Sequence, residues 1–199
     1  GFSMSRTSAW LAAALAALVL LVGCGQPYAY NGTAYPEPLA TPQFTLTSES
    51  GEPMQLSDLQ DKVVLIFFGY TTCPDVCPTT LAEARTILND LGSDAQDVTF
   101  LFVTVDPARD TPEKLAAYTD AFHPGIIGLT GEPDQLAPVY DEFGVLAERV
   151  EAPDSALGYL MNHTSRMFLV DQQGNLRLSY RYGTPPEDIV NDVKHLLKT

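Results

Sequence analysis

Cysteine is scarce in this sequence, with three residues among 199. Small domains that depend on disulfides carry several cysteine pairs, at spacings that join distant segments. Here Cys73 and Cys77 lie so close together that a bond between them would close a very small loop and add little stability. The scarcity therefore excludes a disulfide-stapled scaffold and indicates that this pair has a chemical role.

Basic residues are also few. Lysine and arginine total 11 against 25 aspartates and glutamates, which gives a formal net charge of −14 at pH 7. Proteins that bind nucleic acid or anionic lipid use clustered positive charge to neutralise phosphates. The charge balance argues against nucleic acid and against docking on anionic lipid. The length suits one domain, and no internal repeat is visible.

No apolar run reaches the length of about 20 residues that a spanning helix needs. The longest, residues 9–22, follows Arg6 and fits the core of a signal peptide. The segment Leu21-Val22-Gly23-Cys24 resembles the lipobox of bacterial lipoproteins. That resemblance implies cleavage before Cys24, lipidation of its thiol, and a place on the extracytoplasmic face of the bacterial cell membrane. The alternatives are an uncleaved anchor, or a secretory signal with an incidental cysteine.

The chain therefore divides into three expected parts. Residues 1–23 form a signal peptide of the lipoprotein type. Residues 24–42, rich in proline, glycine and tyrosine, read as a tether between membrane and domain. Residues 43–199 form the folded domain.

The domain is organised around the segment Cys73-Pro74-Asp75-Val76-Cys77-Pro78. The apolar residues 63–68 before it predict a buried strand, and residues 78–91 after it predict a helix with apolar residues at helical spacing. We expect Cys77 at the helix start, where free N–H groups and the helix dipole favour thiolate. Two such sulfurs can exchange with disulfides or hold a soft metal ion, and the residues alone leave both open.

The remaining pattern predicts an α/β fold. Strand, thiol pair and helix in succession, followed by a closing hairpin and helix, is the thioredoxin-like arrangement. We expect a central mixed sheet flanked by helices, parallel at its centre, with an N-terminal hairpin. The other predicted elements are a first hairpin (44–46, 54–56), strands 98–105 and 126–129, helices 111–122 and 134–143, extended segments 145–150 and 159–162, a second hairpin (166–170, 176–181) and a helix over 186–197.

Three segments resemble the Sco/SenC family of membrane-tethered copper proteins. Residues 68–81, with both cysteines, are similar to that family's signature, and residues 105–113, from Val105-Asp106-Pro107 onward, are similar to its segment after the second central strand. His163 sits where the family carries its third copper ligand, although Asn162 replaces the aspartate that commonly precedes it. The resemblance implies that Cys73, Cys77 and His163 bind one copper ion, as Cu(I) or Cu(II).

The resemblance also implies a function: a membrane-anchored copper chaperone that supplies the binuclear copper site of cytochrome c oxidase. Its expected partners are the oxidase copper-site subunit and other copper chaperones. The rival is a thiol-disulfide oxidoreductase that reduces the cysteines of that subunit. Three residues between the thiols, rather than two, favour metal only modestly. A peroxidase would need an arginine near a thiolate, which the sequence does not position. Asp106 either braces the site or starts a turn.

Overall fold

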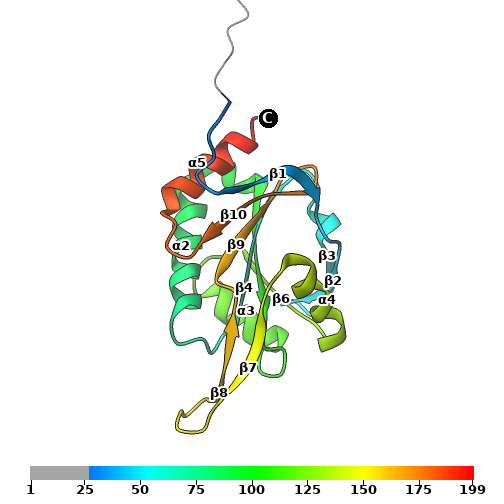
Figure 1. Cartoon of the computed structure of the whole chain (residues 1–199), viewed down its shortest axis with the longest axis vertical. Coiled ribbons are helices and arrows are strands. Elements are labelled where there is room, and N and C mark those ends of the chain that lie inside the picture. Colours follow the sequence, from blue (N-terminus) through cyan, green and yellow to red (C-terminus); the bar gives the residue numbers. More distant parts are fainter. Residues whose placement is uncertain (1–26) are drawn as a thin grey trace, which may run out of the picture.

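The computed structural model describes residues 27–199, so the predicted signal peptide and Cys24 lie outside the described residues. Within residues 27–199, no helix is both long enough and apolar enough to cross a bilayer. Eight strands form one sheet (Figure 1). In spatial order they are β1 (Thr33–Ala40), β10 (Asn175–Arg181), β9 (Arg166–Val170), β4 (Val63–Gly69), β5 (Val98–Thr104), β6 (Ile126–Thr130), β2 (Thr45–Ser48) and β3 (Pro53–Gln55).

The centre of the sheet is parallel. Strand β5 pairs in parallel with β4 and β6, whereas β9 runs antiparallel to β4. Every residue of β4 and β5 is buried, because these strands have helices on both faces and their side chains are apolar or β-branched. This confirms the predicted α/β fold with a mixed sheet. The first predicted hairpin is also present as the antiparallel pair β2–β3.

Helices cover both faces of the sheet. They are α2 (Val76–Leu91), α3 (Pro112–Asp120), α4 (Pro133–Phe143) and α5 (Pro186–Leu196), with short 3-10 helices at Leu56–Leu59 and Gly92–Asp97. Neighbouring residues of a strand point to opposite faces. Phe68 packs against Tyr140 of α4, whereas Gly69 lies against Cys77 of α2 on the other face. Helix α5 packs beside α2 (Figure 1).

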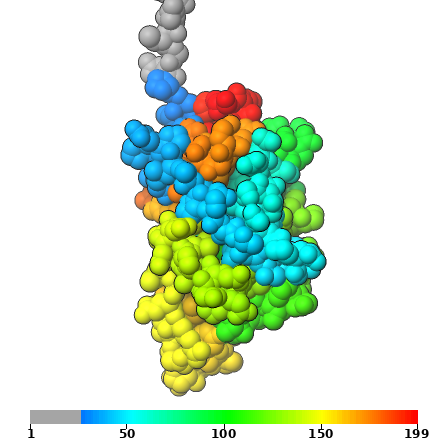
Figure 2. All heavy atoms as spheres, turned by 90° about the vertical axis from the view of Figure 1, so that its right-hand side faces the viewer, coloured from blue at the N-terminus to red at the C-terminus, as the bar shows by residue number. Residues whose placement is uncertain are grey.

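A second, two-stranded sheet projects from one end of the domain. It is the hairpin of β7 (Ala147–Ala152) and β8 (Gly158–His163), drawn in yellow to orange in Figure 1 and seen as a protrusion in Figure 2. Its strands pair with each other and not with the main sheet. The extended segments predicted on either side of residues 153–155 are thus confirmed, and His163 is the last residue of the hairpin.

The predicted boundary between tether and domain needs a correction. Residues 33–40, assigned from the sequence to the tether, form strand β1, which pairs antiparallel with β10. Nearly all of β1 is exposed, and its register shifts across Pro36 and Pro38. An edge strand that contains prolines has no alternating apolar pattern to reveal it. The folded part therefore begins before residue 43.

A buried carboxylate holds the segment before β1 on α5. Asp192 of α5 has no exposed surface and accepts hydrogen bonds from the hydroxyls of Tyr28 and Tyr180. It also accepts from the backbone N–H groups of Asn31 and Gly32, at 2.9–3.1 Å. Burial removes the water molecules that would hydrate this carboxylate, and the backbone and hydroxyl donors take their place.

We expect Asp192→Ala to lower the free energy of unfolding by about 3 kcal/mol, because it leaves the buried Tyr180 hydroxyl and several partly buried donors without an acceptor. Urea denaturation measures the change, and limited proteolysis should show faster cleavage near residues 28–32. Asn191→Ala, at the exposed neighbouring position of the same helix, is the matched control and should change stability by less than about 0.5 kcal/mol. Equal stability of the two variants would contradict this role of Asp192.

Candidate metal centre

The two cysteines lie on the connection from β4 to α2. The chain leaves β4 at Gly69, turns, and enters α2 at Val76, so Cys73 is in the turn and Cys77 in the first turn of the helix. The N–H of Cys73 donates to the Tyr70 carbonyl at 3.2 Å, which closes the turn. Cys77 is fully buried and Cys73 is partly exposed, so access to the pair is through Cys73.

The end of β4 must be glycine for the Cys77 sulfur to sit where it does. A Cβ on Gly69 would lie 2.8 Å from Cys77 Sγ and 2.8 Å from the Phe102 ring. Cβ atoms in proteins essentially never make contacts this short. The absent side chain therefore provides the space in which the sulfur packs against the sheet.

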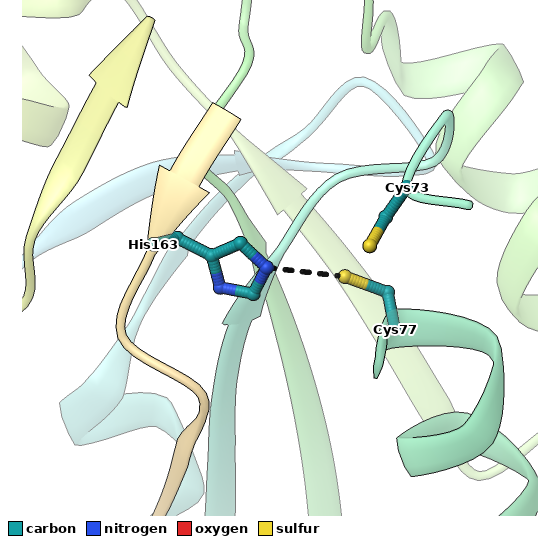
Figure 3. A group of neighbouring side chains, drawn as sticks. All are labelled: Cys73, Cys77 and His163. Atoms are coloured by element: carbon teal, nitrogen blue, oxygen red, sulfur yellow. Dashed lines mark hydrogen bonds between the residues drawn. The ribbon is translucent and has the colours of Figure 1, made fainter. Parts of the chain in front are cut away.

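The imidazole of His163 reaches this pair from 86 residues away along the chain. Its Nε2 lies 3.5 Å from Cys77 Sγ, and the ligand atoms of Cys73, Cys77 and His163 all lie within 4.8 Å of one another (Figure 3). Metal–sulfur and metal–nitrogen bonds of about 2.0–2.3 Å bring the ligands of one ion to within about 4.6 Å of each other. The three residues implied by the resemblance thus converge at a spacing that suits one ion.

The imidazole is oriented for ligation. Its Nδ1 lies 3.3 Å from the Thr164 carbonyl oxygen, which can only accept a hydrogen bond. Nδ1 therefore carries the proton, and the lone pair of Nε2 faces the sulfurs. The rings of Phe67 and Tyr70 flank the imidazole edge-to-face, with centroids 6.0 and 5.8 Å away. Packing against these two rings restricts the rotation of His163.

The protonation of the pair corrects the expectation that the helix start favours a Cys77 thiolate. A hydrogen bond from the Cys77 thiol, together with the N–H groups of Asp75 and Cys77, lowers the pKa of Cys73. The same bond, together with burial, raises the pKa of Cys77. The free N–H groups at the helix start thus point at the preceding sulfur. The pair shares one proton, which stays on Cys77.

The side chains of other residues considered from the sequence are not among the three that converge. Asp75 occupies the N-cap position of α2, but its side chain makes no capping hydrogen bond. His123 accepts a hydrogen bond from the N–H of Gly125 with its Nδ1. His195 stacks on Tyr28 at a centroid distance of 3.8 Å.

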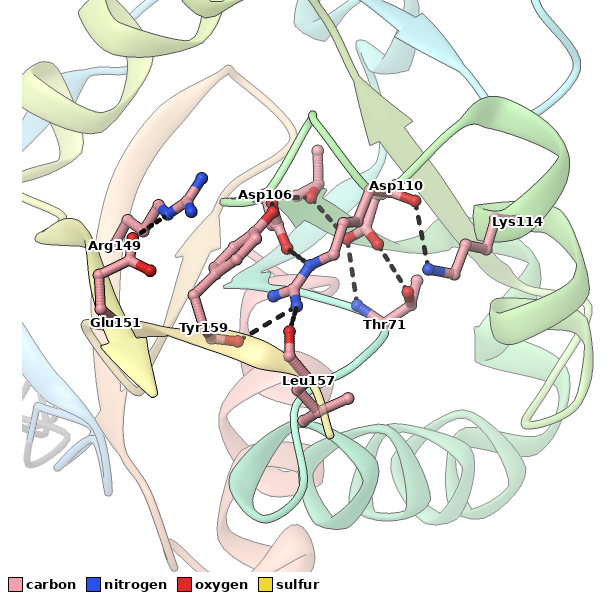
Figure 4. Close-up of polar contacts among 10 residues, drawn as sticks. Thr71, Asp106, Asp110, Lys114, Arg149, Glu151, Leu157 and Tyr159 are labelled. Atoms are coloured by element: carbon pink, nitrogen blue, oxygen red, sulfur yellow. Dashed lines mark hydrogen bonds and ion pairs between the residues drawn. The ribbon is translucent and has the colours of Figure 1, made fainter. Parts of the chain in front are cut away.

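Sequence reasoning missed the residue that braces the thiol turn. Asp110, 1% exposed, accepts from both the N–H and the hydroxyl of Thr71, at 3.1 and 2.6 Å, and from the Thr104 hydroxyl at 2.7 Å. It thereby joins the loop after β5 to the loop that bears Cys73 (Figure 4). The available signal was a second aspartate close behind Asp106, just after a buried strand.

These features define a class of protein: a thioredoxin-like domain in which two thiols at a strand-to-helix turn meet one distant imidazole. Soft thiolates with an imidazole suit copper and zinc, and a dithiol on its own suits disulfide exchange. The geometry permits either chemistry.

Comparison with known proteins identifies the family. The SCO1/SenC family model matches residues 33–198. A SCO2-like protein of Rickettsia felis is 35% identical over 188 residues, covering 88% of this chain and 92% of its own. Copper-bound ScoI of Bradyrhizobium japonicum is 38% identical with a TM-score of 0.73, covering 79% of this chain and 99% of its own. Apo Sco1 of Thermus thermophilus is 38% identical with a TM-score of 0.77, covering 87% and 100%. The chain belongs to the SCO1/SenC family.

We expect limiting iodoacetamide at pH 6 to modify Cys73 of the reduced protein before Cys77. Cys73 is the partly exposed thiolate, whereas Cys77 is buried and holds its proton because its pKa is raised. Peptide mass spectrometry over time measures the order. In urea the two thiols should react at similar rates. Faster modification of Cys77 in the folded protein would contradict the assigned protonation.

Proposed function

We propose that this protein is a copper chaperone that binds one copper ion through Cys73, Cys77 and His163. The observation that carries the proposal is the convergence of two sulfurs and an imidazole nitrogen within 4.8 Å from distant parts of the chain. Copper-bound structures of related Sco proteins, such as that from Bradyrhizobium japonicum, support it. Copper is here the cargo of the protein.

The donor set suits uptake and release. Thiolates stabilise Cu(I), and imidazole suits copper in either oxidation state. Three ligands leave the ion open to attack by a partner's donor atoms, so copper can pass by exchange of one ligand at a time. Cys77 must give up its proton when the ion binds, so binding releases a proton and strengthens as pH rises.

The proposed recipient is the binuclear copper site of cytochrome c oxidase, and other copper chaperones are the proposed donors. Membership of the SCO1/SenC family and the resemblance in residues 68–81 support this assignment. A cleft of about 400 Å³ lies between the loop after β5 and the hairpin that ends in His163, and it offers room for a partner. Tyr159 and Met161 line this cleft and lie on the same face of β8 as His163, so a partner seated there would contact the strand that carries the imidazole.

We also propose that the mature chain begins at a lipidated Cys24 and is held on the extracytoplasmic face of the bacterial cell membrane. The apolar residues 9–22 and the segment Leu21-Val22-Gly23-Cys24 support this. Acyl chains anchor through their buried methylene groups, at about 0.8 kcal/mol each. An anchor of this kind would keep the chaperone near a membrane-bound recipient.

Mass spectrometry of the protein extracted from bacterial membranes tests the anchor. We expect an N-terminus at Cys24 that carries a diacylglyceryl group, and loss of that group with retention of the signal peptide in Cys24→Ala. Finding residues 9–22 still attached to the wild-type protein would contradict lipidation and indicate a transmembrane anchor.

A second function, reduction of disulfides, is favoured by the asymmetry of the thiols. Cys73 is partly exposed with a lowered pKa, and Cys77 is buried and protonated. This is how an attacking thiol and a resolving thiol differ in dithiol reductases. The same pair could hold copper when reduced or give its electrons to the recipient's cysteines.

Anaerobic copper titration with metal counted per chain separates the two functions. Reduced wild-type protein should bind one copper, and protein oxidised with diamide should bind none because its sulfurs are joined. His163→Ala should weaken binding by more than about tenfold, as loss of a ligand exceeds loss of an outer contact. It should also remove the spectral features of a mixed sulfur–nitrogen copper(II) site. His123→Ala is the matched control and should bind as the wild type does.

Thiol-disulfide exchange should be almost unchanged in His163→Ala, since that reaction needs only the two sulfurs. Undiminished copper binding in this variant, together with turnover as a reductase, would favour the oxidoreductase over the chaperone.

A further inference from the structure

The hairpin β7–β8 has to be held in place by side chains. Its strands pair only with each other in the described part of the chain, and it projects from the end of the domain (Figure 1). His163 is its last residue, so the position of the imidazole depends on the position of the hairpin. A ligand carried by an element outside the main sheet needs a specific attachment near the metal centre.

Arg109 supplies that attachment. It lies on the loop after β5, and its Nη1 donates to the carbonyl oxygens of Leu157 and Tyr159, each at 3.2 Å. Its Nε donates to the carboxylate of Asp106, which is 3% exposed. A charge-assisted bond at one edge of the guanidinium fixes the plane in which the other edge reaches the hairpin.

The contacts close on themselves through Tyr159. The guanidinium carbon of Arg109 lies 3.7 Å from the centroid of the Tyr159 ring, and the Tyr159 hydroxyl donates to the second oxygen of Asp106 at 2.8 Å. Each member of this latch, defined as Arg109, Asp106 and Tyr159, therefore contacts the other two. Figure 4 labels Asp106 and Tyr159. Cation–π attraction and two bonds to a desolvated carboxylate make such a cluster rigid.

The same loop sets the thiols and the imidazole relative to each other. The N–H groups of Arg109 and Asp110 both donate to the Asp106 carbonyl at 3.0 Å, so the loop is a compact turn. From this turn the side chain of Asp110 binds Thr71 on the loop that bears Cys73, and the side chain of Arg109 binds the hairpin. Arg109 also lies 5.8 Å over the ring of Tyr70, which flanks His163.

We infer that Arg109 is a positioning residue for the metal centre: through the latch it holds His163 against the two thiols. The inference rests on the proposed copper site for its functional meaning, but the latch itself belongs to the metal-free protein. Without Arg109 the thiols stay where Asp110 places them, and the hairpin loses the two bonds to its carbonyls and keeps only the Tyr159–Asp106 hydrogen bond of the latch, so the centre becomes a dithiolate with an intermittent third ligand.

Arg109→Met and the control Arg149→Met test this. Arg149 also lies over the Tyr159 ring, at 3.9 Å, but its ion pair, with Glu151, is exposed. In metal-free protein, amide hydrogen exchange of residues 158–163 should be about tenfold faster in Arg109→Met, because charge-assisted bonds to the hairpin are lost. It should be unchanged in Arg149→Met. Equal exchange in wild type and Arg109→Met would overturn the inference whether or not the protein binds copper.

Copper binding gives the second readout. Like His163→Ala, Arg109→Met should bind copper more weakly and should lose the spectral features of a sulfur–nitrogen copper(II) site. Both thiols should still react fully with a thiol reagent. The double variant with Arg109→Met and His163→Ala should lose little more copper affinity than His163→Ala alone, since Arg109 acts through His163. Additive losses would show that Arg109 acts elsewhere and would overturn the inference. If the wild type binds no copper, the proposed function fails and hydrogen exchange alone decides on the latch.

Two milder variants guard against a general loss of structure. Tyr159→Phe removes only the hydroxyl bond to Asp106, and Arg109→Lys keeps the charge but cannot bond two carbonyls and a carboxylate in one plane. Both should give exchange rates for residues 158–163 between wild type and Arg109→Met, with unchanged exchange in β4 and β5. Faster exchange throughout the sheet in every variant would mean that Arg109 supports the whole fold, and would overturn the specific role.

Discussion

The hydrogen bonds of the Asp110 carboxylate join the two loops on which the metal centre is built. The parallel strands β4 and β5 end side by side, so the loops that follow them start at the same edge of the sheet. Asp110, on the second loop, binds the N–H and hydroxyl of Thr71 on the first. A buried carboxylate with several donors fixes geometry more strictly than apolar packing does, because any displacement leaves a charge without partners. This contact fixes the position of the turn that bears Cys73.

The two thiols differ in pKa because Cys77 is buried against the sheet, whereas Cys73 accepts hydrogen bonds at the start of the helix. Gly69 leaves space for the Cys77 sulfur on the sheet, where exclusion of water favours the neutral thiol. The Cys73 sulfur accepts hydrogen bonds from N–H groups at the start of α2 and from the Cys77 thiol, and these bonds favour the Cys73 thiolate. One proton on two sulfurs leaves the pair ready to lose that proton to an incoming metal ion, or to start disulfide exchange with the exposed member.

Several parts of the fold could be read from the sequence for clear reasons. The strands β4 and β5 are continuous apolar runs, and α3 begins with a Thr111 cap whose side chain accepts from the N–H of Lys114. Strand β1 could not be read, because an exposed edge strand with prolines carries no periodic pattern. The thiolate was assigned to Cys77, since its place at the helix start was visible in the sequence whereas its burial was not. The sequence left two roles for Asp106, to brace the site or to start a turn. The structure shows both, because its carbonyl closes the turn and its carboxylate accepts a hydrogen bond from Tyr159.

The sequence by itself determined what is local. The residues of the thiol turn, the strand before it and the helix after it are adjacent in the chain, so spacing and composition were enough to find them. His163 could be named only through the family resemblance, because nothing in its own neighbourhood distinguishes a ligand from a surface histidine. Only the tertiary structure brought its Nε2 to 3.5 Å from the Cys77 sulfur, turned its lone pair toward the pair, and put Arg109 across the hairpin that carries it. Those contacts join residues far apart in sequence, and they exist only once the sheet has ordered its strands and the hairpin has closed onto the loops at its edge.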